Sequence, residues 1–188
     1  MTEEEKTKKL EQACTLLLEA IGEDPSRDGL LKTPKRFAGA WKEMMSGYDF
    51  DAKKLATAFD GENYDQMVVV KDIEFHSFCE HHILPIIGTV SVAYIPNNKI
   101  IGLSKIPRIV EVFAKRLQNQ ERMTTQIADT ITDIIKPKGV AVKVSANHMC
   151  MHMRGVRKTS SSMDTMAVRG LFRTDEKTRF EFLKSIEK

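Results

Sequence analysis

The sequence predicts an α+β fold, in which an antiparallel sheet carries helices on one face and follows an N-terminal helical extension. The chain has 188 residues, of which 41% are hydrophobic and 29% charged, as is ordinary for one globular domain. Apolar residues recur at helical spacing near the N-terminus, and Val- and Ile-rich segments of strand type begin near residue 67. Paired strand segments then flank two helix segments, an order that favours antiparallel pairing over alternating β-α units.

The N-terminal region is expected to hold two helices. Apolar residues spaced three or four apart predict an amphipathic helix over residues 3–22. Cys14 lies on the apolar stripe of this helix, where a buried packing cysteine is expected. Thr33 and Pro34 predict the cap and the first turn of a second helix. The polar residues 48–65 then predict a connection.

The rest of the chain predicts a β-β-α-α-β-β order and a final helix. Clustered or alternating β-branched and aromatic residues predict strands over 67–78, 87–95, 140–146 and 163–172. Helical periodicity predicts a helix capped by Ser104, a second through Met123 and Ile134, and a third capped by Thr174 with Phe180, Leu183 and Ile186 on its apolar face. The free edges of a four-stranded sheet favour pairing between neighbouring copies, and therefore an oligomer.

Composition and charge exclude several classes of protein. No apolar stretch reaches the ~18 residues of a membrane helix, and the charged first residues lack the apolar region of a secretory signal. The net charge of +3 is too small to indicate a nucleic-acid-binding protein. Three cysteines, odd in number and far apart, argue against a disulfide framework. We therefore expect a cytoplasmic protein that binds neither membranes nor nucleic acid.

Two short clusters hold nearly all the metal-binding residue types: Cys79-Glu80-His81-His82 and His148-Met149-Cys150-Met151-His152. One turn can bring Cys79 and His82 to the same ion, and alternation predicts that His148 and Cys150 share the buried face of a strand. Zinc prefers sulfur and imidazole ligands. Cys79, His82 and Cys150 are therefore expected to bind Zn²⁺ and to leave a fourth position for water.

The histidines beside these ligands leave alternatives open. His81 or His148 could be a fourth ligand and close a structural site, or both could donate and accept protons near a catalytic metal. The clusters could also bind no metal. His76 and His152 are expected at the surface or behind the ligands.

Four motifs, in this order, resemble those of the GTP cyclohydrolase I family: Cys79-Glu80-His81-His82, Gly102-Leu103-Ser104-Lys105, Gln118-Asn119-Gln120-Glu121-Arg122 and His148-Met149-Cys150-Met151-His152-Met153-Arg154-Gly155. The resemblance extends from about Thr33 to Phe172 and implies the tunnelling fold, a ββ-αα-ββ unit. It also implies a homodecamer of two face-to-face pentamers with active sites at subunit interfaces. We expect an N-terminal helical region over 1–65 and a tunnelling-fold catalytic domain over 66–188, working as one unit.

The resemblance implies an enzyme that converts GTP and water to formate and 7,8-dihydroneopterin triphosphate, the first step of tetrahydrofolate or pterin biosynthesis. Its zinc would be held by Cys79, His82 and Cys150. His148 resembles the family's histidine that protonates nitrogen 7 of the purine, and His81 resembles a second catalytic histidine. Ser104 matches a serine near the ribose.

The remaining implied residues bind the substrate. Glu121 matches a buried carboxylate that accepts two hydrogen bonds from guanine, which adenine could not donate. Gln120 matches a position that contacts the purine. The triphosphate would be bound by four cationic side chains: Lys105, Arg108, Arg154 and Arg36, the last supplied by another subunit.

Two other functions are weighed against this one. A tunnelling-fold relative that acts on another purine or pterin through a cysteine nucleophile is disfavoured by the full Cys79/His82/Cys150 set. A zinc-stabilised nucleic-acid-binding module, using the basic residues Arg154–Lys158, is disfavoured by the low net charge and by the expected burial of His148 and Cys150.

Overall fold

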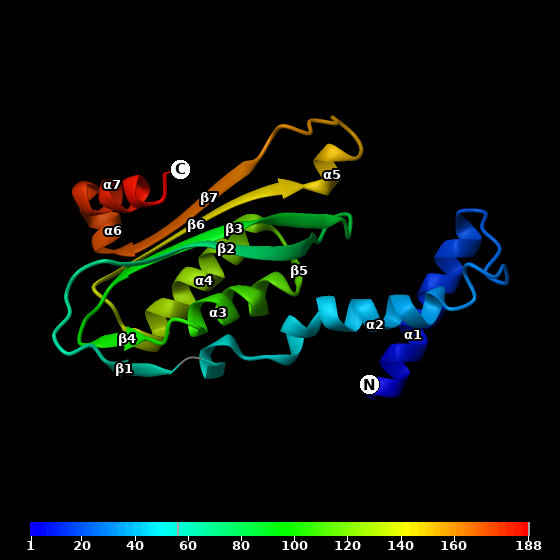
Figure 1. Cartoon of the computed structure of the whole chain (residues 1–188), viewed down its shortest axis with the longest axis horizontal. Coiled ribbons are helices and arrows are strands. Elements are labelled where there is room, and N and C mark those ends of the chain that lie inside the picture. The colour runs from blue at the N-terminus through cyan, green and yellow to red at the C-terminus, as the bar shows by residue number, and fades with distance from the viewer. Residues whose placement is uncertain (56, 188) are drawn as a thin grey trace. The chain divides into compact units, whose positions relative to one another are not determined.

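The computed structural model describes residues 1–55 and 57–187, and its element order is drawn in Figure 1. The chain divides into two compact units, Met1–Ser46 and Gly47–Lys188. The expected division into 1–65 and 66–188 stays a prediction. In the part of the chain that the structure describes, no helix is long and apolar enough to cross a membrane.

The first unit is a pair of packed helices, α1 (Glu3–Ala20) and α2 (Thr33–Met44). Thr2 caps α1, because its side chain accepts a hydrogen bond from a backbone N–H of the first turn. Cys14 is 3% exposed and Ala38 is fully buried, so the predicted packing role of Cys14 is confirmed.

The second unit contains the elements that position the site. In chain order they are η1 (Ser46–Asp49, which begins at the end of the first unit), η2 (Ala52–Leu55), β1 (Ala58–Asp60), β2 (Val68–Cys79), β3 (Pro85–Ile95), β4 (Lys99–Ile101), α3 (Lys105–Ala114), β5 (Leu117–Gln118), α4 (Gln120–Ile135), β6 (Gly139–His148), α5 (Met149–His152), β7 (Met163–Gly170), α6 (Leu171–Thr174) and α7 (Glu176–Ser185).

The main sheet has five strands in the order β5-β2-β3-β6-β7. All its pairings are antiparallel except that of β2 with the two-residue β5. The β2-β3-α3-α4-β6-β7 order confirms the predicted ββ-αα-ββ tunnelling fold. The main sheet was expected to have four strands, and that count was wrong because β5 adds a fifth. The connection expected over 48–65 contains β1, which pairs with β4 in a separate two-stranded sheet.

The sheet separates two hydrophobic cores. Val140 and Val142 of β6 belong to the larger core with the residues of α3 and α4, whereas Ala141 between them packs with Phe172 and Phe182. The helices α3 and α4 therefore cover one face, as predicted, and α6 and α7 also cover one end of the other face (Figure 1). The expected apolar face of the last helix was wrong at Phe180, which is 65% exposed.

The predicted helix caps were also partly wrong. Thr33 lies inside the first turn of α2, and Thr174 ends α6. The cap of α7 is Asp175, whose carboxylate accepts a hydrogen bond from the backbone N–H of Thr178. Ser104 occupies the cap position of α3, but its hydroxyl makes no capping hydrogen bond.

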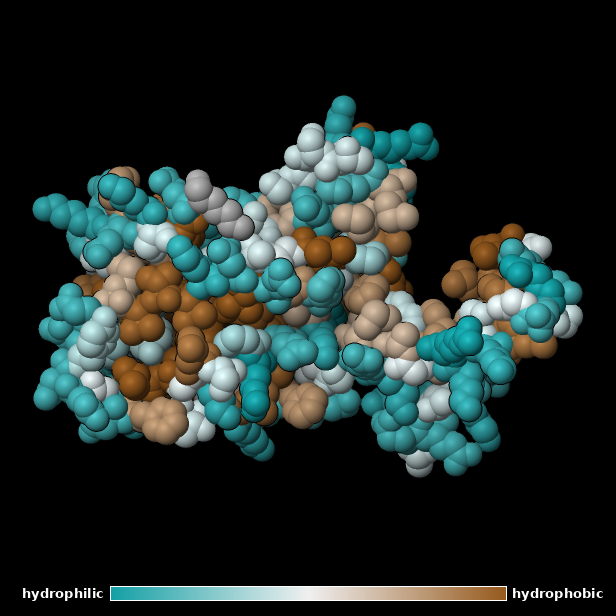
Figure 2. Space-filling view, viewed as in Figure 1, coloured by the Kyte–Doolittle hydropathy of each residue, from teal (hydrophilic) through white to brown (hydrophobic). Residues whose placement is uncertain are grey.

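An apolar groove of about 460 Å³ lies beside the two-stranded β1–β4 sheet, and Figure 2 shows apolar side chains gathered in this part of the unit. Its lining combines β1, β2 and β4 with the start of α3. Three of its side chains are strongly exposed: Phe59 at 53%, Tyr64 at 49% and Leu103 at 69%. Apolar patches of this kind mark surfaces that bind other molecules.

Candidate metal centre and active site

The strand register brings the two cysteine–histidine clusters together. Cys79 is the last residue of β2, and a tight turn closed by a 2.8 Å bond from the N–H of Ile83 to the carbonyl of Cys79 leads into β3. The second residue of β3, Ile86, pairs with His148 at the end of β6. The one-turn helix α5 follows directly and carries Cys150. Both clusters therefore lie at the same end of the sheet.

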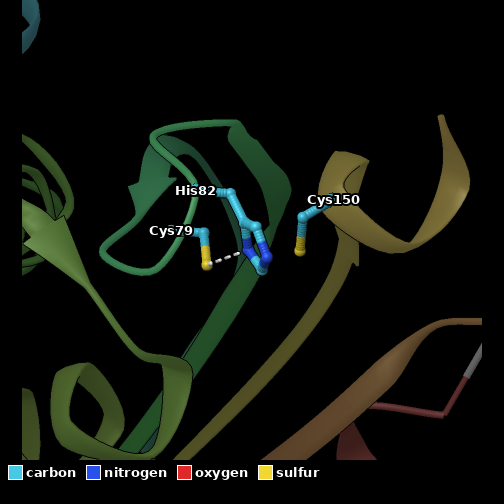
Figure 3. Close-up of side chains that lie close together, drawn as sticks. All are labelled: Cys79, His82 and Cys150. Carbon is cyan, nitrogen blue, oxygen red and sulfur yellow. Dashed lines mark hydrogen bonds between the residues drawn. The ribbon is translucent and has the colours of Figure 1, made fainter. Parts of the chain in front are cut away.

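Cys79, His82 and Cys150 form the metal-binding group. Each offers one ligand atom, and these atoms lie within 4.8 Å of one another. Figure 3 shows the three side chains pointing toward one another, with the Cys79 Sγ–His82 Nδ1 contact of 3.8 Å drawn as a dashed line. Cys79 is 5% exposed, Cys150 is half-buried and His82 is exposed, so the group opens to solvent on the histidine side.

The chemistry of this group suits a soft divalent cation. Burial raises the pKa of the Cys150 thiol, and the neighbouring Cys79 thiol raises it further. Two adjacent thiols cannot both ionise easily without a cation between them, whereas zinc binds thiolates and imidazole readily. The donor set therefore fits zinc with three protein ligands.

The expected placement of Cys150 on a strand was wrong. Pairing with β3 stops at His148, and Met149 begins the helical turn of α5, so His148 and Cys150 are not alternate residues of one strand. Cys150 reaches the metal group because the chain turns there.

His148 is held by a buried glutamine. Its Nε2 lies 2.8 Å from Oε1 of Gln120, the first residue of α4, whose side chain is 1% exposed. Burial lowers the pKa of His148, and the nearby Glu121 carboxylate acts in the opposite direction. His148 therefore favours its neutral form and lies close enough to Glu121 to interact with it.

His81 also lies beside the metal group, with its Nδ1 3.5 Å from Cys79 Sγ. Its side chain is 66% exposed, so it can reach a molecule bound from solvent. His76 is exposed, and His152 donates a hydrogen bond from Nε2 to the backbone carbonyl of Ser161 at 2.9 Å. These two histidines are surface and supporting residues, as expected.

The sequence did not predict the ion pair between Glu80 and Arg122. The Arg122 guanidinium donates to the Glu80 carboxylate, to Gln118 Oε1 and to the carbonyl of Leu117. The hydrogen bond from Arg122 to Glu80 holds the pKa of Glu80 below its usual range. Glu80 lies between the ligands Cys79 and His82. The pair therefore ties the metal-binding turn to the first turn of α4.

The other expected site residues divide into two groups. The first group lies near the metal end of the sheet. The Arg154 guanidinium weakly opposes the raised pKa of Cys150. The Glu121 carboxylate opposes the lowered pKa of His148. Glu121 is exposed, whereas a buried carboxylate was expected.

The second group lies at the start of α3, on its cap residue and in its first turn: Ser104, Lys105 and Arg108. Within the described residues, no hydrogen bond or salt bridge joins it to the cysteine–histidine group. Arg36 is in α2, in the other compact unit.

Comparisons with known proteins agree with one another. The GTP cyclohydrolase I family profile matches residues 10–187. Proteins named GTP cyclohydrolase 1 are 51% identical in Wolinella succinogenes, over 97% of this chain and 98% of the relative, and 52% identical in Campylobacter curvus, over 94% and 93%. A Neurospora crassa protein of the same name is 50% identical over 97% of this chain and 59% of its own length.

Among solved structures, the apo form of an archaeosine synthase QueF-Like aligns over 55% of this chain and 93% of that chain, at a TM-score of 0.44 and 17% identity. That likeness is too weak to add to the family assignment. The profile match and the half-identical relatives of nearly the same length are decisive. The chain belongs to the GTP cyclohydrolase I family.

Proposed function

We propose that this chain hydrolyses GTP by opening the imidazole ring of the purine, releasing formate and forming 7,8-dihydroneopterin triphosphate for tetrahydrofolate or pterin synthesis. Half-identical relatives named GTP cyclohydrolase 1 support the reaction class. The observation that carries the proposal is the convergence of Cys79, His82 and Cys150 within 4.8 Å. Three protein ligands with an open side are typical of a catalytic zinc site and not of a closed structural one.

Zinc is the proposed cofactor, held by Cys79, His82 and Cys150. Bound there, it would supply a water of lowered pKa for attack on an electrophilic carbon. His148 is proposed to exchange a proton with the purine ring. Burial lowers the pKa of its imidazole and so favours the neutral form, which can accept a proton. The exposed His81 is proposed to act on the substrate from the solvent side of the group.

The substrate is proposed to lie across the first turn of α4 and the metal group. Glu121, exposed on that turn, would accept hydrogen bonds from the guanine ring N–H and the 2-amino group. The cationic Lys105, Arg108, Arg154 and Arg36 would bind the triphosphate, and Ser104 would lie near the ribose.

We further propose that the site is completed by a second copy of the chain in a homodecamer. In the described part of a single chain, the hydrogen bonds of Cys79, His82 and His148 go to partners other than Ser104 and Lys105, so we propose that a neighbouring copy supplies one of the two groups. The exposed apolar groove beside Leu103 supports burial against such a copy.

One assay tests the proposal. Zinc-loaded protein is incubated with GTP, and formate and the fluorescence of oxidised neopterin are measured. Turnover of GTP but not ATP is expected, and no turnover at full metal occupancy would refute the proposal. Cys150→Ser should lose zinc and activity together, His148→Ala should retain zinc and lose ring opening, and Glu121→Gln should bind GTP more weakly.

A further inference from the structure

Gln120 fastens the start of α4 to two strands. Its side-chain nitrogen Nε2 lies 3.1 Å from the carbonyl oxygen of Val144 in β6 and 2.8 Å from that of Met163 in β7. It also lies 3.1 Å from Oγ1 of Thr165 in β7. These three acceptors surround one amide nitrogen in a position that is 1% exposed. A buried amide with this many partners has one orientation only.

The acceptors determine which end of the amide faces which neighbour. The carbonyls of Val144 and Met163 can only accept, so a rotated amide would bring Oε1 against two oxygens with no proton between them. The hydroxyl groups agree with this direction. Thr124 donates to the backbone carbonyl of Gln120 at 2.6 Å, so Thr165 donates to Thr124 at 2.7 Å and is left to accept from Gln120 Nε2. Every proton in this network has an acceptor.

The orientation of Gln120 fixes the proton on His148. Oε1 of Gln120 is an acceptor only, and it lies 2.8 Å from Nε2 of His148. A hydrogen bond at this distance requires the proton on Nε2. In a neutral imidazole the other nitrogen, Nδ1, then carries the free lone pair.

We propose that Gln120 is a positioning residue that holds His148 in the Nε2–H tautomer, so that Nδ1 is the nitrogen that exchanges a proton with the substrate. The proton-exchange role of His148 itself rests on the proposed function. In that step Nδ1 of the neutral Nε2–H imidazole takes up a proton from solvent, the resulting imidazolium gives this Nδ1 proton to a purine ring nitrogen, and the ring returns to the neutral Nε2–H form. The amide of Gln120 is occupied by protein, so its side chain does not bind the purine.

The tautomer can be measured on the wild-type, zinc-loaded protein without any turnover. Solid-state ¹⁵N NMR of histidine-labelled protein distinguishes protonated from unprotonated ring nitrogens, and a difference spectrum against His148→Gln assigns the His148 signals. We expect Nε2 protonated and Nδ1 unprotonated. A neutral His148 with its proton on Nδ1, or an Nδ1 bound to zinc, would overturn the proposal, even if no Gln120 variant folds.

A matched pair of variants tests whether Gln120 is the cause. Gln120→Met keeps the side-chain volume and removes the acceptor, so both tautomers of His148 should be populated. Gln118→Met is the control, because Gln118 is 2% exposed and is equally engaged, donating to Phe113 O and Gln126 Oε1 at 2.9 Å each. The control should keep the Nε2–H tautomer. A pure Nε2–H tautomer in Gln120→Met would show that another group fixes it and would refute the proposal.

Kinetics separate this inference from the proposed function. Gln120→Met should lower kcat by about 10²-fold or more, the scale of general acid–base catalysis, with little change in KM. A lost tautomer preference with unchanged kcat refutes Nδ1 as the proton-exchanging atom. Absence of turnover in the wild type refutes the proposed function, while the tautomer remains independently measured.

Discussion

The terminal helix α7 is expected to depend on one side chain. Phe182 is fully buried and is the only buried residue of this ten-residue helix. Its ring packs edge-on against Phe172, with the centroids 6.0 Å apart and the planes at 78°. A helix this short is marginal in isolation. Phe182 should therefore supply the largest single share of the free energy that holds α7 on the sheet, and the partly buried Leu183 and Ile186 pack beside it.

Phe182→Ala should destabilise this region by about 3–5 kcal/mol, the range for removing a buried phenylalanine. Of this, the edge-to-face pair with Phe172 should contribute about 0.5–1.5 kcal/mol, measurable in a double-mutant cycle. Amide hydrogen exchange in α7 should accelerate strongly, while exchange in the buried helix α4 changes less, because α7 borders only the smaller core.

Phe180→Ala is the matched control, since Phe180 lies on the same helix and is 65% exposed. It should change the free energy of unfolding by no more than about 0.5 kcal/mol. Equal effects of the two substitutions on urea unfolding and on exchange in α7 would refute the assignment of Phe182 as the docking residue.

Three further predictions concern the sheet, the metal-binding turn and acid stability. Gly88→Ala would place a Cβ 2.2 Å from the backbone oxygen of Ser145, so it should destabilise the fold by about 1–3 kcal/mol or more and weaken β3–β6 pairing; an unchanged urea midpoint would contradict this. Arg122→Met removes the ion pair of Glu80 beside the ligands and should raise the zinc dissociation constant several-fold, as competition with a chelator can measure. Lys136→Met is the control and should leave that constant unchanged, because Lys136 caps the far end of α4 and its ion pair with Asp133 is exposed. Hydrogen bonding from Ser145 and then Lys143 lowers the pKa of Asp164 in the folded protein. The stabilising effect of the Asp164 carboxylate is therefore present above the unfolded pKa of about 3.9 and is lost as pH falls through the lower folded value. Asp164→Asn should be less stable than wild type at pH 6, and the difference in the free energy of unfolding should disappear in strong acid.

Periodicity in the sequence was sufficient for the long elements. The strands β2, β3, β6 and β7 and the helices α3 and α4 follow the expected segments, because each buries a regular apolar stripe. The elements β1, β5, α5 and α6 were missed, since two to four residues are too few to display a period, and the strand predicted over 163–172 ends at Gly170 because α6 begins there. The pairing partners of β1 and β5 are distant in sequence, so only the tertiary structure identifies these two strands.

The metal group was predictable because soft ligands are rare and here they cluster. The contacts that support it were not. The partners Glu80 and Arg122 are 42 positions apart, and nothing in either local sequence indicates that they meet. Gln120 was expected to contact a purine, yet its amide direction depends on carbonyl groups of two strands that follow it in the chain. Such contacts follow from register, which residue types alone do not determine.

The origin of the ligands from distant segments has a consequence for the order of folding. Cys79 and Cys150 are about 70 residues apart, and they meet only when β6 has paired with β3. Pairing between distant strands is a slow step, because the chain must first close a long loop. Before that pairing, the chain offers an ion only Cys79 and His82, a two-ligand site of low affinity. We therefore expect the metal to be taken up late, after the sheet has formed, so that zinc uptake reports the completion of folding.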